Sequence, residues 1–552
     1  MSKKILQKLE LTWIGKGNEP KLEPRILIED PNKSFGDPKS ENMLIHGDNL
    51  LALKALEENY SGAVKCIYID PPYNTGQAFK HYDDGLEHSL WLNLMYQRIN
   101  ILYKLLKKDG VLFINLDEME HAYCKVVCDE IFGRQNYIGD LIWQKRKGGG
   151  NDSRYFAIDH DYILVYAKSK DKLVHKVKWR VSQNEEYLKR YKEIDDNGDR
   201  YYWDTIARDG LQNPIPVSVV CPDGFILTIN SQKAQDTIEK GLKDGTIRLI
   251  KGRNGWTLHH RVYMPEGQVL RSILTEIGTN KTAGDEIKEL FGSDNTFDYP
   301  KPESLISKIL ELTTKKGDLV IDSFLGSGTT AAVAHKMKRK WIGIELGEHA
   351  TTHCLPRMQQ VVSGKDKGGI SEAVNWKGGG GFKFYTLAPS LVQKDKYGTE
   401  IINPQYNANM LAAAMAKQEG FRYLPDENNY WKQGMSSEKD FIFTTTQFVT
   451  VAMLDKLTEE LKPGESLLVC CKSFAKGCAN RHTNITIKKI PQMLLGRCEF
   501  GKDDYSFNIV NLPHNDDTDI EIEDSEESEA PKTEKKTKAK KQKDDDTQSS
   551  LF

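Results

Sequence analysis

Two consecutive prolines, Pro71 and Pro72, end an apolar run that extends from Ala63 to Ile69. The run is typical of a buried β-strand, and proline cannot continue the hydrogen-bonding ladder of such a strand. Asp70 and Tyr73 flank the prolines. A carboxylate, an exposed carbonyl and an aromatic ring therefore lie together at the carboxyl end of a strand, where open α/β sheets bind ligands. We expect a site that holds a flat ring with a polar edge, although the same residues can also form a simple strand-ending turn.

A second glycine-rich turn follows about 250 residues later, between a strand at Leu319 to Asp322 and a helix at Thr329 to Met337. Gly326 and Gly328 let the backbone approach a ligand closely, and the helix N-terminus offers unpaired amides to an anion. The spacing also satisfies the loose dinucleotide pattern, with Glu345 after the next strand as the acid that binds a ribose. The loop has no Gly-Lys-Ser/Thr ending, so a nucleotide triphosphate is disfavoured. Spacing alone does not choose between a nicotinamide dinucleotide and S-adenosylmethionine.

Strands alternate with helices on both sides of the first motif. A strand at Met43 to Ile45 leads into a helix that reaches Tyr60, a second helix spans Leu90 to Lys107, and a third spans His121 to Phe132. This alternation predicts an α/β fold with a doubly wound, mostly parallel sheet. Asp48 falls at the first strand-to-helix turn, where it can act as the helix N-cap.

Taken together, Asp-Pro-Pro-Tyr at 70 to 73 and Asp-Ser-Phe-Leu-Gly-Ser-Gly-Thr-Thr at 322 to 330 resemble the catalytic and cofactor motifs of amino methyltransferases that act on exocyclic amines of DNA bases. The catalytic motif precedes the cofactor motif, which is the circularly permuted order of the beta class. Length and flanking blocks are most similar to modification subunits of type III restriction-modification systems. A dehydrogenase has no use for the first motif, so the resemblance decides for S-adenosylmethionine.

The resemblance implies a function: transfer of a methyl group from S-adenosylmethionine to N6 of an adenine that is flipped out of duplex DNA. It implies catalytic roles for Asp70, Pro71, Pro72 and Tyr73. It implies cofactor contacts from Asp48, Lys301, Asp322, Phe324, Gly326, Gly328, Thr329 and Glu345. No metal is implied. Two alternatives stay open: methylation of cytosine at N4, and action mainly as the DNA-recognition module of a restriction complex.

Lys145, Arg146 and Lys147 precede three glycines at the end of a predicted strand. They suit a loop that closes on a phosphate backbone, and also a mobile surface loop. Residues 171–270 mix aromatic, basic and turn residues without clear periodicity. An ordinary small domain contains the same residues, but in the family order this insertion is the target recognition domain.

The predicted boundaries are as follows: an N-terminal arm at 1–40, the two parts of a catalytic domain at 41–170 and 271–385 around the recognition domain, a C-terminal α+β domain at 386–513, and a charged tail at 514–552. From Asn515 onward 13 acidic residues face 7 lysines, a net charge of −6 that leaves +4 for the remainder of a chain whose net charge is −2. The composition of the tail predicts disorder.

The last five residues, Gln548 to Phe552, are similar to peptides that bind the replication sliding clamp, but a frayed terminus is the preferred interpretation. The resemblance implies double-stranded DNA, a second copy of the chain and a helicase-nuclease restriction subunit as partners. No signal peptide, long apolar run or zinc-ligand spacing among the nine cysteines is found. We therefore expect a cytoplasmic protein with reduced thiols.

Overall fold

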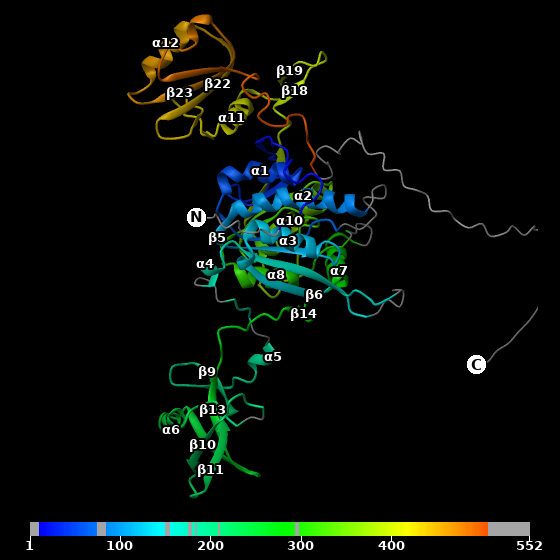
Figure 1. The fold of residues 1–552 in the computed structure, drawn as a ribbon, viewed down its shortest axis with the longest axis vertical. Helices are drawn as coiled ribbons and strands as arrows, with labels where there is room; N and C mark the ends of the chain where they lie inside the picture. Colours follow the sequence, from blue (N-terminus) through cyan, green and yellow to red (C-terminus); the bar gives the residue numbers. More distant parts are fainter. Residues whose placement is uncertain are drawn as a thin grey trace, which may run out of the picture. The chain divides into compact units, whose positions relative to one another are not determined.

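The computed structural model describes residues 10–73, 84–148, 155–174, 179–182, 185–207, 210–292, 297 and 299–505, with the backbone alone for 84–87 and 185–186. A central sheet organises this chain (Figure 1). Its strands are β1 (Leu27–Glu29), β2 (Phe35–Gly36), β3 (Met43–His46), β4 (Val64–Ile69), β5 (Leu106–Leu116), β6 (Tyr137–Gln144), β7 (His160–Ala167), β14 (Ile273–Leu274), β15 (Leu319–Asp322), β16 (Lys340–Glu345) and β17 (Gly381–Leu387).

The sheet runs in the order β1-β17-β3-β16-β15-β4-β5-β7-β6-β14, with β2 paired to β17. The six strands from β17 to β5 are parallel to one another. β7 runs antiparallel to both β5 and β6, and β1 is antiparallel to β17. The prediction of a mostly parallel α/β sheet is therefore confirmed, with one reversed strand inside it.

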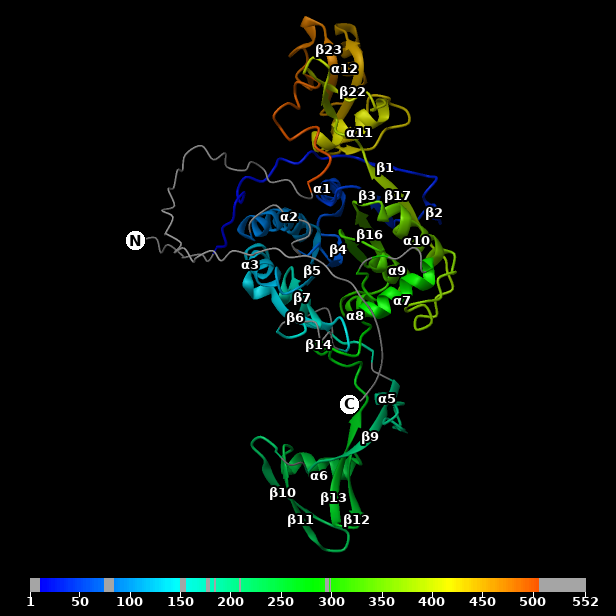
Figure 2. The same ribbon diagram turned by 90° about the vertical axis from the view of Figure 1, so that its right-hand side faces the viewer.

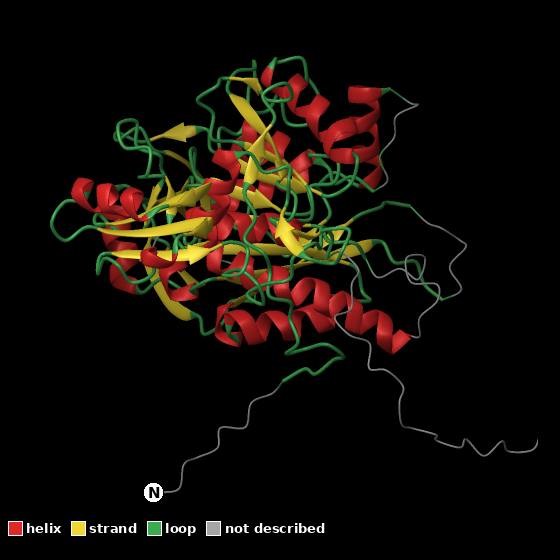
Figure 3. Cartoon of the chain, turned by 90° about the horizontal axis from the view of Figure 1, so that it is seen from above, coloured by secondary structure: helices red, strands yellow, loops and turns green. Residues whose placement is uncertain are grey.

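Helices cover both faces of this sheet (Figures 2 and 3). One layer holds α1 (Asn49–Tyr60), α2 (Asp84–Leu105) and α3 (His121–Phe132). The other holds α8 (Glu303–Thr313), α9 (Thr329–Lys336) and α10 (Leu355–Val362), and α7 (Asn280–Phe291) lies near it. β4 shows why both layers form: Ile67 and Ile69 pack into the first core, while Cys66 and Tyr68 pack into the second.

Two further differences from the sequence predictions concern element ends. The helix predicted over 90–107 ends at Leu105, because Leu106 already pairs with Val64 as the first residue of β5. A short π-helix, Ala350–Cys354, precedes α10. Between them the two helical layers leave the carboxyl ends of β4, β5 and β15 at one edge of the sheet.

Residues 193–263 form sheets of their own. The strands β8 (Glu193–Ile194), β9 (Arg200–Thr205), β12 (Ile247–Gly252) and β13 (Gly255–Tyr263) make one sheet, and β10 (Ile215–Val220) and β11 (Ile226–Ser231) make a hairpin. Helix α6 (Gln235–Asp244) packs with them around a separate hydrophobic core. Short helices α4 (Lys170–Val174) and α5 (Glu185–Leu188) precede these sheets.

Residues 392–489 form a last group of elements with two small cores. These are the hairpin β18 (Val392–Lys394) and β19 (Glu400–Ile402), the helices α11 (Ala408–Gln418) and α12 (Val451–Glu460), and the sheet strands β20 (Arg422–Tyr423), β21 (Gly434–Met435), β22 (Asp440–Val449), β23 (Ser466–Phe474) and β24 (Ile485–Lys489). Among the described helices, none is both long and apolar enough to cross a bilayer.

Candidate active site

Asp70 and Asp322 leave the sheet side by side. Asp70 directly follows β4, and Asp322 is the last residue of β15. These two strands pair in parallel through Cys66–Val320 and Ile67–Ile321. Because both strands end at the same edge, the Pro-Pro turn and the glycine loop open onto one cavity of about 630 Å³. Two segments that are about 250 residues apart in the sequence thus share a single site.

Asp70 is held from two sides. Its Oδ2 lies 2.5 Å from Lys301 Nζ, and its Oδ1 accepts a hydrogen bond from the Tyr73 hydroxyl at 3.2 Å. Burial raises the pKa of Asp70 above its usual range, and the Lys301 ammonium opposes that rise. The side chain is still 22% exposed, so a ligand in the cavity can reach the carboxylate.

The Tyr73 hydroxyl contacts three polar side chains, those of Asp70, Asp161 and Asn115. It is 3.0 Å from Asp161 Oδ2, and Asn115 Nδ2 donates to it at 2.5 Å. Lys145 Nζ in turn lies 2.7 Å from the other Asp161 oxygen. Burial, followed by the two nearby carboxylates, raises the pKa of Tyr73 well above its usual value. The phenol is therefore a fixed neutral donor, and its ring is anchored at the cavity wall.

Sequence reasoning missed Asn115 and Asp161. Asn115 lies near the end of β5, the strand next to β4. Its place near the end of a predicted parallel strand could have identified it as a site residue. Asp161 lies at the start of β7, which reaches the same edge because it runs antiparallel to β5. No local sequence pattern shows that β7 runs in the opposite direction, so the position of Asp161 at this edge could not be predicted.

The glycine loop has the backbone that its sequence demands. Gly326 and Gly328 adopt φ of +54° and +83°, in the left-handed region that favours glycine. Glu345 Oε2 accepts from the Gly326 amide at 2.8 Å, and its Oε1 accepts from the Gly347 amide at 3.0 Å. Glu345 therefore holds the glycine loop through backbone hydrogen bonds and does not line the cavity.

Asp322 is 3% exposed and ties the loop together. Its oxygens accept from the Phe324 amide at 3.0 Å and from the Thr330 hydroxyl at 2.6 Å. Burial is the main reason that the pKa of this carboxyl rises to about 7, and the charges of Asp70 and Glu345 add to it. Asp322 thus remains partly protonated near neutral pH.

The cavity brings together most of the residues that the sequence nominated. Those that line it are Asp70, Pro71, Pro72, Tyr73, Lys145, Arg146, Lys301, Asp322, Phe324, Gly326 and Thr329. Gly328 does not line the cavity, but it is the N-cap of α9, directly before Thr329. Lys301 sits between the two motifs, with Nζ 5.5 Å from the centre of the Tyr73 ring.

Asp48 does not line the cavity. It is 1% exposed and caps α1 through a hydrogen bond from the Leu51 amide at 3.0 Å. Its other oxygen accepts from Arg98 Nη2 at 3.3 Å and from the Tyr505 amide at 3.0 Å. The N-cap interpretation is confirmed, and both oxygens are occupied by donors of the protein itself.

The basic residues Lys145, Arg146 and Lys147 differ from one another in their surroundings. Lys145 points inward to Asp161, and Arg146 Nε lies 2.7 Å from Asp159 Oδ1. Lys147 is exposed. Gly149, Gly150 and Asn151 lie outside the described residues. Two of the three cations thus already have carboxylate partners, which weakens the case for three free phosphate contacts.

The cavity also fits a ligand like S-adenosylmethionine, which carries a carboxylate, an ammonium, a sulfonium and an aromatic ring with a polar edge. The Tyr68 hydroxyl in its wall is buried and has no hydrogen-bond partner in the described part of the chain. A Cβ built on Gly326 would meet Phe297 Cζ at 3.3 Å, so only glycine leaves that space open. The cavity thus offers such a ligand the Tyr68 hydroxyl, the Lys301 ammonium and the backbone of the glycine loop.

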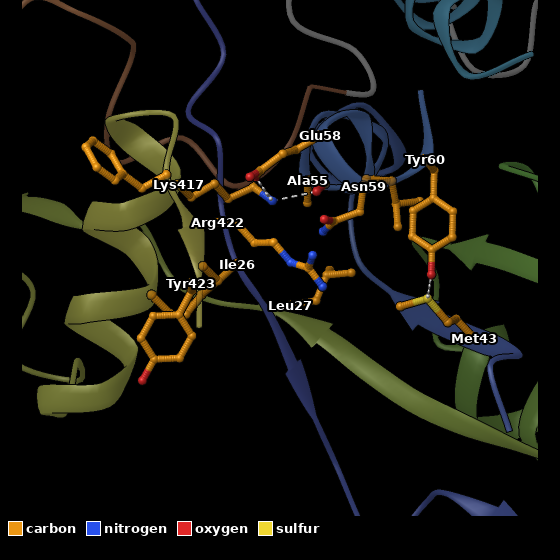
Figure 4. A pocket seen from close by; sticks show the side chains of 13 residues that line it. Ile26, Leu27, Met43, Ala55, Glu58, Asn59, Tyr60, Lys417, Arg422 and Tyr423 are labelled. Carbon is orange, nitrogen blue, oxygen red and sulfur yellow. Dashed lines mark hydrogen bonds and ion pairs between the residues drawn. The ribbon is translucent and has the colours of Figure 1, made fainter. Parts of the chain in front are cut away.

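A larger cavity of about 880 Å³ contains none of the predicted residues (Figure 4). It lies between β1 and α1 on one side and α11 and β20 on the other. Lys417 Nζ donates there to the Ala55 carbonyl at 2.6 Å and lies 3.8 Å from Glu58. Neither the Pro-Pro turn nor the glycine loop reaches it, so we assign the chemistry to the smaller cavity.

This chain belongs to the N6/N4 DNA methylase family, whose profile matches residues 64–354, more than half of the sequence. The fold and the cavity geometry agree with that class of enzyme.

Among curated proteins it is 32% identical over 413 residues to the "Probable type III restriction-modification enzyme HindVI Mod subunit" of Haemophilus influenzae, covering 64% of this chain and 55% of that protein. It is 32% identical over 348 residues to the type III StyLTI Mod subunit of Salmonella typhimurium, covering 56% and 51%. It is 28% identical over 472 residues to the type III EcoP15I Mod subunit of Escherichia coli, covering 70% and 72%. The chain thus spans about half the length of the first two relatives.

Among solved structures, the PvuII DNA methyltransferase, described as cytosine-N4-specific, is 16% identical, with coverage of 61% of this chain and 88% of that one and a TM-score of 0.32. A TM-score of 0.32 does not support a conclusion about which base this chain methylates.

Proposed function

We propose that this chain transfers a methyl group from S-adenosylmethionine to N6 of adenine in duplex DNA. One observation carries the proposal: the Asp-Pro-Pro-Tyr turn and the glycine loop open onto the same cavity at the carboxyl edge of the sheet. Membership in the DNA methylase family supports the reaction class, and the type III Mod relatives support adenine N6 as the target.

Asp70 and Tyr73 prepare the target amine in the proposed mechanism. The lone pair of an aromatic amine is delocalised into its ring, so the amine is a poor nucleophile. Asp70 Oδ1 and the Pro71 carbonyl accept hydrogen bonds from its two N–H groups, which localises the lone pair on nitrogen and orients it. The Tyr73 hydroxyl lies 3.2 Å from that same oxygen in the free protein, and a carboxylate oxygen has lone pairs for both the hydroxyl and the amine.

Lys301 has a complementary role. Its ammonium, 2.5 Å from Asp70 Oδ2, favours the ionised form of the carboxylate and opposes the rise in its pKa that burial causes. S-adenosylmethionine, when bound, supplies an electrophilic methyl group. The base must leave the helix to reach Asp70, at a cost of about a few kcal/mol, and stacking on the Tyr73 ring offsets part of that cost.

The test is a comparison of binding and transfer in Asp70→Ala. We expect affinity for S-adenosylmethionine within about threefold of the wild type, and loss of methyl transfer by at least about 10³-fold, because the acceptor for the amine is gone. Transfer is measured with radiolabelled cofactor, and mass spectrometry of digested DNA distinguishes N6-methyladenine from N4-methylcytosine. Unchanged turnover in Asp70→Ala would show that Asp70 has no part in the mechanism. Detection of N4-methylcytosine in DNA treated with the wild type would show that the target is cytosine and not adenine.

We further propose that the chain is the modification and specificity subunit of a type III system, acts as a homodimer and pairs with a helicase-nuclease subunit. The relatives are Mod subunits, and the support for these partners comes from them. Co-purification from the native host, with mass determination of the complex, tests both. The clamp-like peptide at 548–552 lies outside the described residues, and a pull-down with and without it decides its role.

A further inference from the structure

We propose that Arg357 and Glu303 act as positioning residues that tie the glycine loop to the Lys301–Asp70 pair. The inference rests on the proposed function, because it concerns how the cofactor loop is held. Neither residue lines the cavity.

Arg357 contacts the loop directly. It lies on α10, is 1% exposed, and its Nη1 donates to the Ser327 carbonyl at 3.2 Å and to the Thr329 hydroxyl at 2.9 Å. Gly328 between them packs against it, since a Cβ built there would lie 3.6 Å from Arg357 Cδ. One guanidinium therefore holds both sides of the turn that precedes α9.

Glu303 carries the connection to the other motif. Its Oε1 accepts from Arg357 Nη2 at 2.9 Å, and the residue itself is the first of α8. Lys301, two positions earlier, lies 2.5 Å from Asp70. The path therefore runs from the glycine loop through Arg357 and Glu303 to the start of α8, and through Lys301 to the carboxylate at the end of β4.

Stability alone does not account for this arrangement. Glu303 also pairs with Lys336 at 2.8 Å, Lys336 pairs with Asp366 at 2.8 Å, and all of these side chains are at most 2% exposed. Buried ion pairs pay a large desolvation penalty and can often be replaced by apolar side chains without loss. The Arg357 Nε even lacks a hydrogen-bond partner within the described chain. What such directional contacts supply is a fixed spacing between the segments that they join.

The chain offers a matched control. Lys336 contacts Glu303 and Asp366 but no residue of the glycine loop, whereas Arg357 contacts Glu303 and the loop. Arg357→Met leaves Glu303 paired with Lys336, and Lys336→Met leaves it paired with Arg357. Both variants lower the melting temperature, and only the first removes the connection to the loop.

The experiment measures the affinity of the full chain for S-adenosylmethionine by calorimetry below the melting temperature of each variant. We expect the Kd to rise about tenfold or more in Arg357→Met, to rise less in Arg357→Lys, and to stay within about twofold in Lys336→Met. If Arg357→Met does not fold, Arg357→Lys against Lys336→Met gives the same comparison.

An unchanged Kd in the Arg357 variants, or an equal rise in Lys336→Met, overturns the positioning role while the proposed function stands. A wild-type chain that does not bind S-adenosylmethionine at all overturns the proposed function, and the positioning role falls with it.

Discussion

At the scale of single residues, the Tyr73 side chain combines two tasks. Its ring is available for stacking, while its hydroxyl is anchored by Asp70, Asp161 and Asn115. Tyr73→Phe removes only the anchor, so we expect a loss in kcat/KM of about tenfold. Tyr73→Ala also removes the ring, which adds about 1–3 kcal/mol. Single-turnover methyl transfer and the fluorescence of 2-aminopurine at the target position measure the two effects; equal losses in both variants would show that the ring contributes nothing.

Asp322 predicts a dependence of stability on pH. Its carboxyl has a pKa of about 7 in the folded chain, against about 4 in the unfolded chain. The folded state therefore binds the extra proton between these two values, so the free energy of unfolding contributed by this group falls as the pH rises from about 4 to 7 and is constant above.

In Asp322→Asn this contribution is absent. The Asn amide can still accept from the Phe324 amide and donate to the Thr330 hydroxyl, so the loop keeps its hydrogen bonds. We expect the stability of the variant relative to the wild type to increase by about a few kcal/mol between pH 5 and pH 8. Urea unfolding of both proteins at four pH values measures it, and two parallel curves would contradict the assignment.

At the scale of elements, the turn between β15 and α9 is the most demanding local structure of the site. Gly328 has φ of +83° and packs 3.4 Å from Cys354 Cα, measured from a built Cβ. Gly317 has φ of +82°, but a Cβ there meets nothing within 4 Å. Both Gly→Ala changes therefore cost about 1 kcal/mol of backbone strain.

Gly328, however, belongs to the glycine loop and is the N-cap of α9, so strain there acts on the cofactor loop itself, whereas Gly317 precedes β15 and lies outside the loop. We expect it to weaken S-adenosylmethionine binding by about tenfold or more, while Gly317→Ala leaves the affinity unchanged. Calorimetry and thermal unfolding on the same samples measure both properties. Equal affinities in the two variants would show that the left-handed conformation of Gly328 has no effect on cofactor binding.

The same elements explain what could be predicted from the sequence. Asp70 and Gly326 could be assigned to one edge because parallel strands end together, and proline and glycine mark those ends in the sequence. Asp161 could not, because its position depends on the reversed direction of β7. Arg357 could not either, since an arginine on a short helix reads as a surface residue until the fold buries it.

At the scale of the whole molecule, residues 182–267 make up most of the region predicted as a recognition domain, and they leave and rejoin the described central domain next to each other. Val181 and Gln268 pair there as an isolated antiparallel bridge, with backbone hydrogen bonds of 2.9 and 2.8 Å. The residues between them have their own core of Ile206, Val217, Val219, Ile238, Ile247 and Leu258, to which the described remainder of the chain contributes no side chain. Such an insertion is expected to fold and to be removable as a unit.

Replacing residues 182–267 with a short Gly-Ser linker tests this division. Because paired residues across antiparallel strands lie about 5 Å apart, the linker spans the gap without strain. The central cores and the cavity keep all their side chains, so we expect S-adenosylmethionine affinity within about threefold of the full chain. Sequencing of modified bases in DNA treated with the full chain should reveal a target motif, and DNA treated with the shortened chain should show none. If the shortened chain modified the same motif, sequence recognition would lie outside residues 182–267, and the aromatic and basic residues of β9, β12 and β13 would have another purpose.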